Sequence, residues 1–345
     1  YQAASSTDLF YQPIINKDWT NGFWTGEIWL AYEHTKKNIF KYAALIQVED
    51  FYKRINEEFS VDHHDLGFLY SLSCVAGYKL TGDETAKKAA IMAAEKLITR
   101  FQEKGEFIQA WGEMGDKDSY RLIIDCLLNL PLLYWATEVS GNPDYAAKAE
   151  AHIQTAMKCV VRPDNSTYHT HFLDIKTGEP TYGVTHQGNR NGSAWARGQA
   201  WAIYGMAITY RETGKEEYLN TAKNVAGYFL SHLPEDKVPV WDFRADKENR
   251  WAKDSSASAC TASGLLELSS LLPEGPEKEF YYQQALGILK GLYDHYYDDS
   301  EKNQSMIQMG TVNFPVNRFI NVPIIYADFF FTEALITLKH PTNIF

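Results

Sequence analysis

Two aspartates stand where a polar segment gives way to a long, nearly uncharged stretch. Asp65 precedes LGFLYSLSCVAGY and Asp125 precedes CLLNLPLLYWA, and the two are 60 residues apart. A carboxylate in such a position can cap a helix, or it can face a pocket where the buried part of the helix begins. Because both aspartates occupy the same place in similar segments, we interpret them as an acid and base pair that faces one cavity.

Aromatic, imidazole, amide and guanidinium groups accompany these carboxylates. DWTNGFWTG contributes Trp19 and Trp24, and HHDLG contributes His63 and His64. The segment 168–201 is polar and glycine-rich, and we expect it to be a long loop outside the core. Its candidate side chains are His169, His171, His186, Gln187, Trp195, Arg197 and Trp201. Indole rings stack on sugars, amides and imidazoles bind hydroxyls, and Arg pairs with carboxylates, so the set predicts a site for an anionic carbohydrate.

Two of these clusters could instead hold a metal ion, because His and Asp are zinc ligands. They are His169 with His171, and His63 with His64 and Asp65. Neither spacing matches a closed metal site, and the four cysteines form no CxxC pair, so we expect no metal. No Ser or Cys stands in a recognisable nucleophile elbow.

The helices that must position these residues repeat along the chain. A long apolar helix is followed by a short turn and then by an amphipathic helix. The apolar members read TGEIWLAY, DLGFLYSLSCVAGY, DCLLNLPLLYWA, ARGQAWAIYGMAITY, SASACTASGLLEL and ADFFFTEALITL. The turns that follow are marked by Lys36, Gly82, Gly141, Gly214 and Gly275. A helix that is apolar on every side must be buried on every side, whereas the half-polar helices suit an outer layer.

Six such pairs predict an all-α fold, an (α/α)6 barrel of six helical hairpins that forms a single domain over residues 1–345. An open α-solenoid is the alternative, but its terminal repeats would carry polar caps. Few residues precede the first inner helix, so the N-terminal outer helix is expected to be missing or shortened. Inner helices of a closed barrel begin at one end, so their polar first residues should share one mouth. These residues are Thr25, Asp65, Asp125, Arg197, Ser255, Ser258 and Asp328.

Composition narrows the choice of partners. A formal charge of −11 argues against nucleic acid or an anionic membrane as partner. No apolar run is long enough for a membrane span, so we expect no membrane insertion. The chain begins with Tyr1, which fits a cleaved secretory signal or a trimmed chain. We therefore expect the bacterial periplasm or the cytoplasm, with the periplasm favoured, and a monomer or weak dimer.

The motifs resemble glycoside hydrolase family 88, the unsaturated glucuronyl hydrolases. The matching strings are DWTNGFWTG, HHDLGFLYSLS, IIDCLLNLPLLYWA, YHTHF, THQG, WARGQAWAIYG, WDF and DSSASACTASGLLEL, and they run in order over residues 18–270. The sister family of unsaturated rhamnogalacturonyl hydrolases shares the barrel, but HHDLGFLYSLS and IIDCLLNLPLLYWA are more similar to the glucuronyl group.

The resemblance implies a role for each matching residue. Asp125 would be the general acid and base, and Asp65 the second essential carboxylate. The implied substrate contacts are Trp19, His64, His169, Gly183, Thr185, Gln187, Trp195, Arg197 and Trp201. The implied substrate is an oligosaccharide that a polysaccharide lyase has left with a 4,5-unsaturated uronic acid at its non-reducing end. Hydration of the vinyl ether double bond would release that sugar without a metal or organic cofactor.

Other functions are still open at this point. One is an unsaturated rhamnogalacturonyl hydrolase, and another is a conventional inverting glycosidase or a lyase on the same barrel. A third, from a different class, is a non-catalytic scaffold that binds carbohydrate.

The resemblance fails near the C-terminus, in 306–323. This stretch is apolar, contains two prolines and has Arg318 as its only charged residue. We expect it to form a flap over the mouth that presents apolar surface, Asn313, Asn317 and Arg318 to the leaving sugar. The alternative is that it packs on the barrel and touches no substrate.

Overall fold

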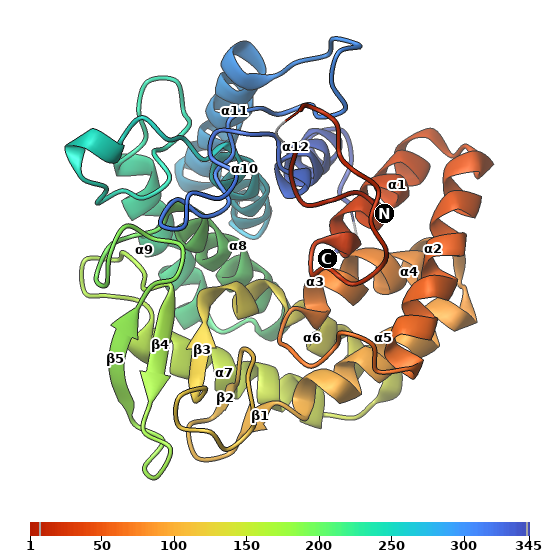
Figure 1. The fold of residues 1–345 in the computed structure, drawn as a ribbon, viewed down its shortest axis with the longest axis vertical. Helices are drawn as coiled ribbons and strands as arrows, with labels where there is room; N and C mark the ends of the chain where they lie inside the picture. Colours follow the sequence, from red (N-terminus) through yellow and green to blue (C-terminus); the bar gives the residue numbers. More distant parts are fainter. Residues whose placement is uncertain (7, 343) are drawn as a thin grey trace.

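The computed structural model describes residues 1–6, 8–342 and 344–345. Its helices alternate between an inner and an outer ring (Figure 1). The inner ring holds α1 (Asn21–Thr35), α3 (Leu66–Tyr70) with η1 (Ser71–Val75) and α4 (Ala76–Thr81), η2 (Ile124–Leu128) with α6 (Pro131–Ser140), α8 (Ala196–Thr213), α10 (Ser255–Ser270) and α12 (Ile325–Thr337). The outer helices are α2 (Asn38–Asn56), α5 (Glu84–Ile98), α7 (Asp144–Cys159), α9 (Glu216–Ser231) and α11 (Pro276–Tyr296).

The barrel is closed rather than open. Helix α12 contacts α10 on one side and α1 on the other, so the last inner helix meets the first. Helices α8 and α10 are buried over nearly their whole length, as their all-round apolar sequences require. The expected all-α barrel is confirmed, and the open solenoid is excluded.

Most of the expected turns have the predicted backbone. Gly82, Gly141 and Gly214 end α4, α6 and α8 with φ of +71°, +72° and +66°, the left-handed conformation that glycine adopts without steric cost. Gly275 does not act in this way, because α10 already ends at Ser270. It instead precedes Pro276, which begins α11.

The helix expected directly after Asp125 begins later than the sequence suggested. Asp125 lies in η2, a 3-10 turn, and the α-helix α6 begins only at Pro131. Proline lacks an N–H and has a fixed φ, so it is suited to the first position of a helix and poorly suited to a later one. The carboxylate therefore stands in a tight turn rather than at the head of an α-helix.

Five short strands were not predicted. β1 (Phe101–Gln102) pairs with β2 (Phe107–Ile108), and β3 (Arg121–Ile123), β4 (Thr170–Leu173) and β5 (Pro180–Val184) form an antiparallel sheet in that order. This sheet extends from one side of the barrel, with β5 outermost (Figure 1). It makes part of the segment 168–201 structured and buried, since His169, Trp195 and the glycine at 188 are buried. The expectation of a loop was wrong for 170–173 and 180–184, where strand pairing satisfies the polar backbone, whereas 174–179 and 185–194 carry no helix or strand.

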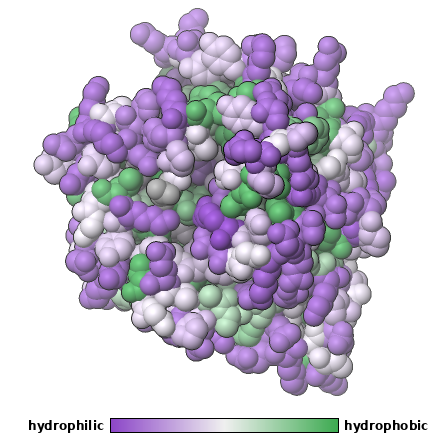
Figure 2. Space-filling model, turned by 180° about the vertical axis from the view of Figure 1, so that it is seen from behind, coloured by the Kyte–Doolittle hydropathy of each residue, from purple (hydrophilic) through white to green (hydrophobic). Residues whose placement is uncertain are grey.

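The N-terminal residues lie along the barrel without forming a helix in the described ranges 1–6 and 8–20. Gln2 pairs with Pro13, and Ser5 pairs with Ile324 just before α12. In the described part of the chain, no helix is long and apolar enough to cross a membrane. The face opposite to Figure 1 is largely hydrophilic, with hydrophobic residues near its centre (Figure 2).

Candidate functional site

The two aspartates stand on neighbouring hairpins that Asn129 joins. Its side-chain oxygen accepts a hydrogen bond from the Phe68 N–H at 2.7 Å, and its amide donates to the Asp125 carbonyl oxygen at 3.1 Å. A Cβ on Gly67 would lie only 2.2–2.6 Å from backbone atoms of Asn129, so no side chain fits there. The turns that carry Asp65 and Asp125 are therefore held together by a close backbone contact and by the hydrogen bond from the Phe68 N–H to Asn129.

Asp65 is surrounded by groups that favour its ionised form. Burial raises the pKa of its carboxyl group, but His64 and His63 and a hydrogen bond from Asn129 more than offset this effect. The His64 Nε2 lies 3.4 Å from one carboxylate oxygen, and the His63 Nδ1 lies 3.5 Å from the other. The net pKa of Asp65 is lowered, so this group is a carboxylate at neutral pH.

Asp125 has the opposite environment. Its pKa is raised to about 7, mainly by burial and also by the negative charge of Asp65, with Arg197 acting in the opposite direction. Its Oδ1 is buried and has no hydrogen-bond partner among the described residues. The two carboxyl groups are thus pushed apart in pKa, the arrangement that separates an acid from a permanently charged partner.

Two buried histidines near the carboxylates are neutral. Burial lowers the pKa of His64 to about 4 and that of His169 to about 3. The His169 Nδ1 lies 2.6 Å from the hydroxyl oxygen of Thr170, and its Nε2 lies 3.1 Å from the amide oxygen of Gln187. The Gln187 amide in turn donates to the Val312 carbonyl oxygen at 2.9 Å. These imidazoles can bind hydroxyl groups but do not supply positive charge at neutral pH.

Arg197 is buried and pairs with a carboxylate of the protein. It forms an ion pair with Asp254 and donates to the hydroxyl of Ser256 at 3.2 Å. It also donates to the carbonyl oxygens of Thr311 and Val312, at 2.9 and 3.0 Å. The guanidinium group of Arg197, which was expected to bind a substrate carboxylate, is therefore largely occupied by partners within the protein. Its contact with substrate stays a prediction. What the structure does establish is that Arg197 anchors 306–323.

Several aromatic side chains of this region pack on one another. Trp19 is partly exposed, and its ring centroid lies 5.6 Å from the rings of both Phe68 and Tyr326. Trp201 is fully buried, with its centroid 5.3 Å from that of Phe68. The Trp201 Nε1 and the Tyr326 hydroxyl are buried without a partner in the described residues. Such groups cost about 1–3 kcal/mol each when unpaired.

Three of the expected helix heads point elsewhere. The Thr25 hydroxyl donates to the Gln47 side chain on α2 at 2.6 Å, because Thr25 lies one turn inside α1. The Ser258 hydroxyl donates to the backbone oxygen of residue 237. Asp328 accepts from the Tyr11 hydroxyl at 2.9 Å and from the N–H of residues 306 and 307, so it ties the N-terminal segment and 306–307 to α12. The expectation that every head lines the mouth was wrong.

Gly183 and Thr185 lie on and just after β5, where local packing already accounts for them. A Cβ at Gly183 would lie 2.3 Å from the ring of Tyr168. The Thr185 hydroxyl accepts from the Gly188 N–H at 2.7 Å, and the Thr185 N–H donates to Asn191 at 3.1 Å. Their contact with substrate also stays a prediction.

Sequence reasoning missed Trp111, Asp254, Asn129 and Tyr326 as residues of this region. Trp111 is 39% exposed, and its ring centroid lies 6.5 Å from that of His64 and 5.8 Å from that of His186. The string QAWGEMG offered a signal, because it places a Trp in a glycine-containing turn shortly before Asp125. An exposed indole beside the carboxylates is a candidate platform for a sugar ring.

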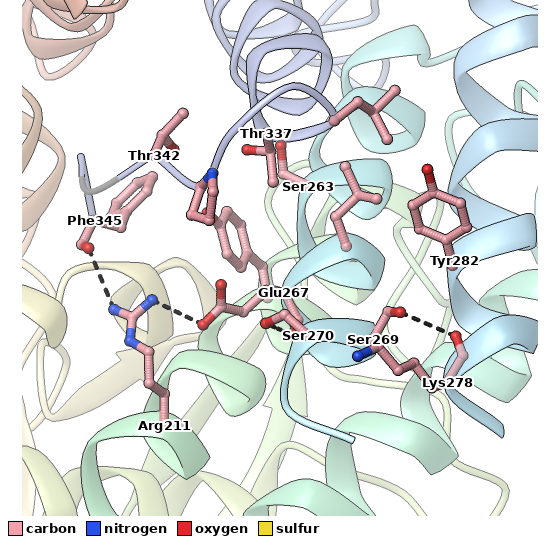
Figure 3. Close-up of a pocket in the computed structure, with 14 residues that line it drawn as sticks. Arg211, Ser263, Glu267, Ser269, Ser270, Lys278, Tyr282, Thr337, Thr342 and Phe345 are labelled. Carbon is pink, nitrogen blue, oxygen red and sulfur yellow. Dashed lines mark hydrogen bonds and ion pairs between the residues drawn. The ribbon is translucent and has the colours of Figure 1, made fainter. Parts of the chain in front are cut away.

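Two further observations concern the described chain away from the predicted site. Among residues 1–6, 8–342 and 344–345, no three His, Cys, Asp or Glu side chains are grouped as metal ligands. A cavity of about 320 Å³ lies at the other end of the barrel, near the C-terminal ends of α8, α10 and α12 (Figure 3). Its charged groups include the ion-paired Arg211 and Glu267, and none of the predicted site residues lines it.

Comparisons with known proteins agree with this geometry. The family model described as Glycosyl Hydrolase Family 88 matches residues 2–336. An unsaturated chondroitin disaccharide hydrolase of Streptococcus pneumoniae is 41% identical over 100% of this chain and 88% of its own length. The solved unsaturated glucuronyl hydrolase of Bacillus sp. GL1 has a TM-score of 0.94 at 41% identity, with 98% of this chain and 90% of that one covered. That of Streptococcus agalactiae has a TM-score of 0.96 at 41% identity, with 100% and 87% covered. The chain belongs to glycoside hydrolase family 88 and is a glycoside hydrolase of the unsaturated glucuronyl hydrolase type.

Proposed function

We propose that Asp125 donates the proton that starts the reaction and later accepts one from water. The observation that carries this assignment is its raised pKa of about 7 together with an Oδ1 that has no partner among the described residues. A carboxyl group that is partly protonated near neutral pH can act as a general acid and, once ionised, as a general base.

The chemistry follows from the substrate of this family. In a 4,5-unsaturated uronic acid the ring oxygen is attached to the double bond, so the group is a vinyl ether. Asp125 transfers its proton to C4, and the positive charge spreads over C5 and the ring oxygen. Water then adds at C5 and returns a proton to the Asp125 carboxylate. The resulting hemiketal opens the ring, and the sugar on the reducing side leaves as an alcohol.

Asp65 supports this reaction as a permanent carboxylate. Its lowered pKa keeps it ionised, and its charge contributes to the raised pKa of Asp125. In this position it also accepts hydrogen bonds from ring hydroxyls of the substrate. The neutral His64 and His169 with Gln187 supply further hydrogen bonds, while Trp19 offers an apolar face for the ring.

The function is tested by following the ultraviolet absorbance of the conjugated double bond in a lyase-generated disaccharide. Hydration of the double bond removes this absorbance, so the signal should fall as free sugars appear. A saturated disaccharide of the same sugars is the matched control and should stay intact. Cleavage of the saturated compound at a similar rate would instead indicate a conventional inverting glycosidase.

Replacement of Asp65 should shift the pH profile as well as lower the rate. Asp65→Asn removes a negative charge that raises the pKa of Asp125. Because Asp125 is active as an acid only while protonated, a lower pKa moves the loss of activity at high pH to lower pH. The profile of kcat/KM against pH measures this limb in the free enzyme. Asp118→Asn, at an exposed carboxylate, should leave the profile unchanged, and an unshifted limb in Asp65→Asn would remove the proposed coupling.

The segment 306–323, the expected flap, should influence which leaving sugar the protein accepts. It forms a hairpin in which Asn313 pairs with Arg318, and Phe314 stacks on Trp241 with ring centroids 4.4 Å apart. Contacts with Arg197 and Gln187 hold its base beside the site, as described above. It is therefore partly packed on the barrel, whereas its tip at 315–318 is exposed.

We expect this flap to favour an unsulfated leaving sugar. A sulfate needs several donors or cations to offset its lost hydration, and Arg318 is the only charged residue in 306–323. Measurement of kcat/KM on matched sulfated and unsulfated unsaturated disaccharides from chondroitin tests this preference. A higher value on the sulfated member of the pair would show that the flap does not select in this way.

A further inference from the structure

Four side chains form a row that leads away from the carboxylates over one face of the outer sheet. Arg121 on β3 is the register partner of Phe172 on β4, and Phe172 lies opposite Tyr182 on β5. The guanidinium carbon of Arg121 lies 4.5 Å from the ring centroid of Trp111 and 5.4 Å from that of Phe172. Phe172 and Tyr182 are stacked, with centroids 5.1 Å apart and an interplanar angle of 19°. We call Trp111, Arg121, Phe172 and Tyr182 the aromatic ladder.

The ladder begins at the catalytic site. The Trp111 ring is in edge contact with His64, whose Nε2 lies 3.4 Å from the Asp65 carboxylate. Trp111 also contacts His186, which packs against His169 with centroids 5.8 Å apart. From there the sheet runs outward from the barrel to β5 (Figure 1). A substrate that leaves the site past Trp111 therefore meets the ladder next.

Both ends of the ladder are open to solvent. Trp111 is 39% exposed and Tyr182 is 57% exposed. One face of Tyr182 rests on Phe172, and no other ring in the described chain stacks on it. Exposed aromatics with a free face are suited to sugar rings, because the apolar C–H face of a sugar packs on them.

Arg121 in the middle of the ladder has hydrogen-bonding capacity left. Its Nη1 donates to the Asp118 carbonyl oxygen at 2.7 Å, and its Nε is buried without a partner. No hydrogen bond from its Nη2 occurs within the described residues. The charge of Asp116 acts on Arg121, but that carboxylate accepts hydrogen bonds from the Ser119 hydroxyl and from a backbone N–H of its own loop. Arg121 is thus a cation between two rings, and its Nη2 has no hydrogen-bond partner within the described residues.

We infer that the aromatic ladder binds the sugars beyond the leaving sugar in longer oligosaccharides, and that Arg121 receives an anionic group there. We assign this anionic group to the carboxylate of an internal uronate. In an unsaturated tetrasaccharide from a polymer that alternates uronate and amino sugar, this uronate is the third sugar. Planar guanidinium groups match carboxylates in geometry. This inference rests on the proposed function, because it extends the same binding path.

The test compares three substrates from unsulfated chondroitin. They are the unsaturated disaccharide, the unsaturated tetrasaccharide, and a tetrasaccharide whose internal uronate has been reduced to a neutral sugar. For the unchanged protein, kcat/KM should be roughly tenfold higher on the anionic than on the neutral tetrasaccharide, the factor for one charge-assisted hydrogen bond. Equal values would overturn the assignment of Arg121 to the carboxylate. Restored activity on a reduced but sulfated tetrasaccharide would assign it to sulfate instead.

Variants show whether Arg121 binds the oligosaccharide or only holds the Trp111 ring in place. Arg121→Gln should abolish the difference between the two tetrasaccharides and leave the disaccharide unchanged, whereas Arg121→Lys should retain part of it. Tyr182→Ala should weaken both tetrasaccharides only. Arg190→Gln, at an exposed arginine paired with Asp246, is the control. An equal loss on disaccharide and tetrasaccharide in Arg121→Gln would show that Arg121 only supports the indole.

Binding measured without turnover keeps this inference distinct from the proposed chemistry. Calorimetric titration of the tetrasaccharide into Asp125→Asn, with and without Arg121→Gln, should show about tenfold weaker binding in the double variant. Loss of this difference would refute the ladder even if the disaccharide is hydrolysed. A wild-type protein that hydrolyses no unsaturated disaccharide would refute the proposed function, whatever the titration shows.

Discussion

Asp125→Asn should lower the rate of double-bond hydration by about 10²–10⁴-fold or more, the usual cost of losing a general acid. The amide cannot donate a proton to C4 and cannot accept one from water, so both halves of the proposed step are lost. Steady-state kcat on an unsaturated disaccharide measures the effect. The fold should be intact, because Asn matches Asp in size and the unpartnered Oδ1 contributes no hydrogen bond in the described structure.

The unfolding midpoint of Asp125→Asn is the necessary control. The variant should unfold at or above the wild-type temperature, since it removes a carboxyl group whose burial disfavours the charged form. A purified variant that keeps more than about a tenth of the wild-type rate is incompatible with a general acid worth 10²-fold. The proton donor would then have to be another group.

Asp254→Ala should cost about 3–5 kcal/mol of the free energy of unfolding, because it leaves the buried guanidinium of Arg197 without its counter-charge. Denaturant unfolding measures the loss. Asp294→Ala is a matched control, since Asp294 pairs with Lys290 on the surface of α11. Such an exposed pair is worth about 0–1 kcal/mol. A loss no larger than that of the control would show that the buried pair does not stabilise the barrel mouth.

Arg197→Lys separates the two roles open to this side chain. Lysine keeps the charge near Asp254 but cannot reproduce the planar fork. A raised KM with an unchanged unfolding midpoint would indicate a contact with the substrate. A lower midpoint with an unchanged KM would indicate that Arg197 serves only to hold Asp254 and the flap.

The helical barrel was predictable because its signal is local and repeated. Helices α8 and α10 are apolar on every side, and turns such as the one at Gly214 carry the residue that their backbone requires. The outer sheet was not predictable in the same way. β3 is three residues long, and it forms because Arg121 and Ile123 pair with Phe172 and Thr170, far along the chain. No periodicity can be read from so short a strand.

The site residues also differ in whether a local sequence pattern reveals them. Asp65, Asp125 and His64 were recognisable because each precedes or occupies the start of an apolar inner segment. Asp254 was not, because its importance comes from Arg197, 57 positions earlier in the chain. Thr25 was misread because it lies one turn inside α1, and its hydroxyl is bound to Gln47 on the neighbouring outer helix. The sequence pattern therefore locates the segments that carry the site. Packing between these segments decides in which direction each side chain points.

The contact at Gly67 and Asn129 has a consequence for how such an enzyme can diversify. The spacing of the two carboxylates is fixed by backbone that admits no added methyl group, whereas the flap and the outer sheet come from other segments. Changes in those segments should alter which oligosaccharide is accepted without disturbing the pair of carboxyl groups proposed to perform the chemistry. The molecule thus separates a part that must stay constant from parts that can be exchanged, and laboratory evolution of substrate preference should start in the second.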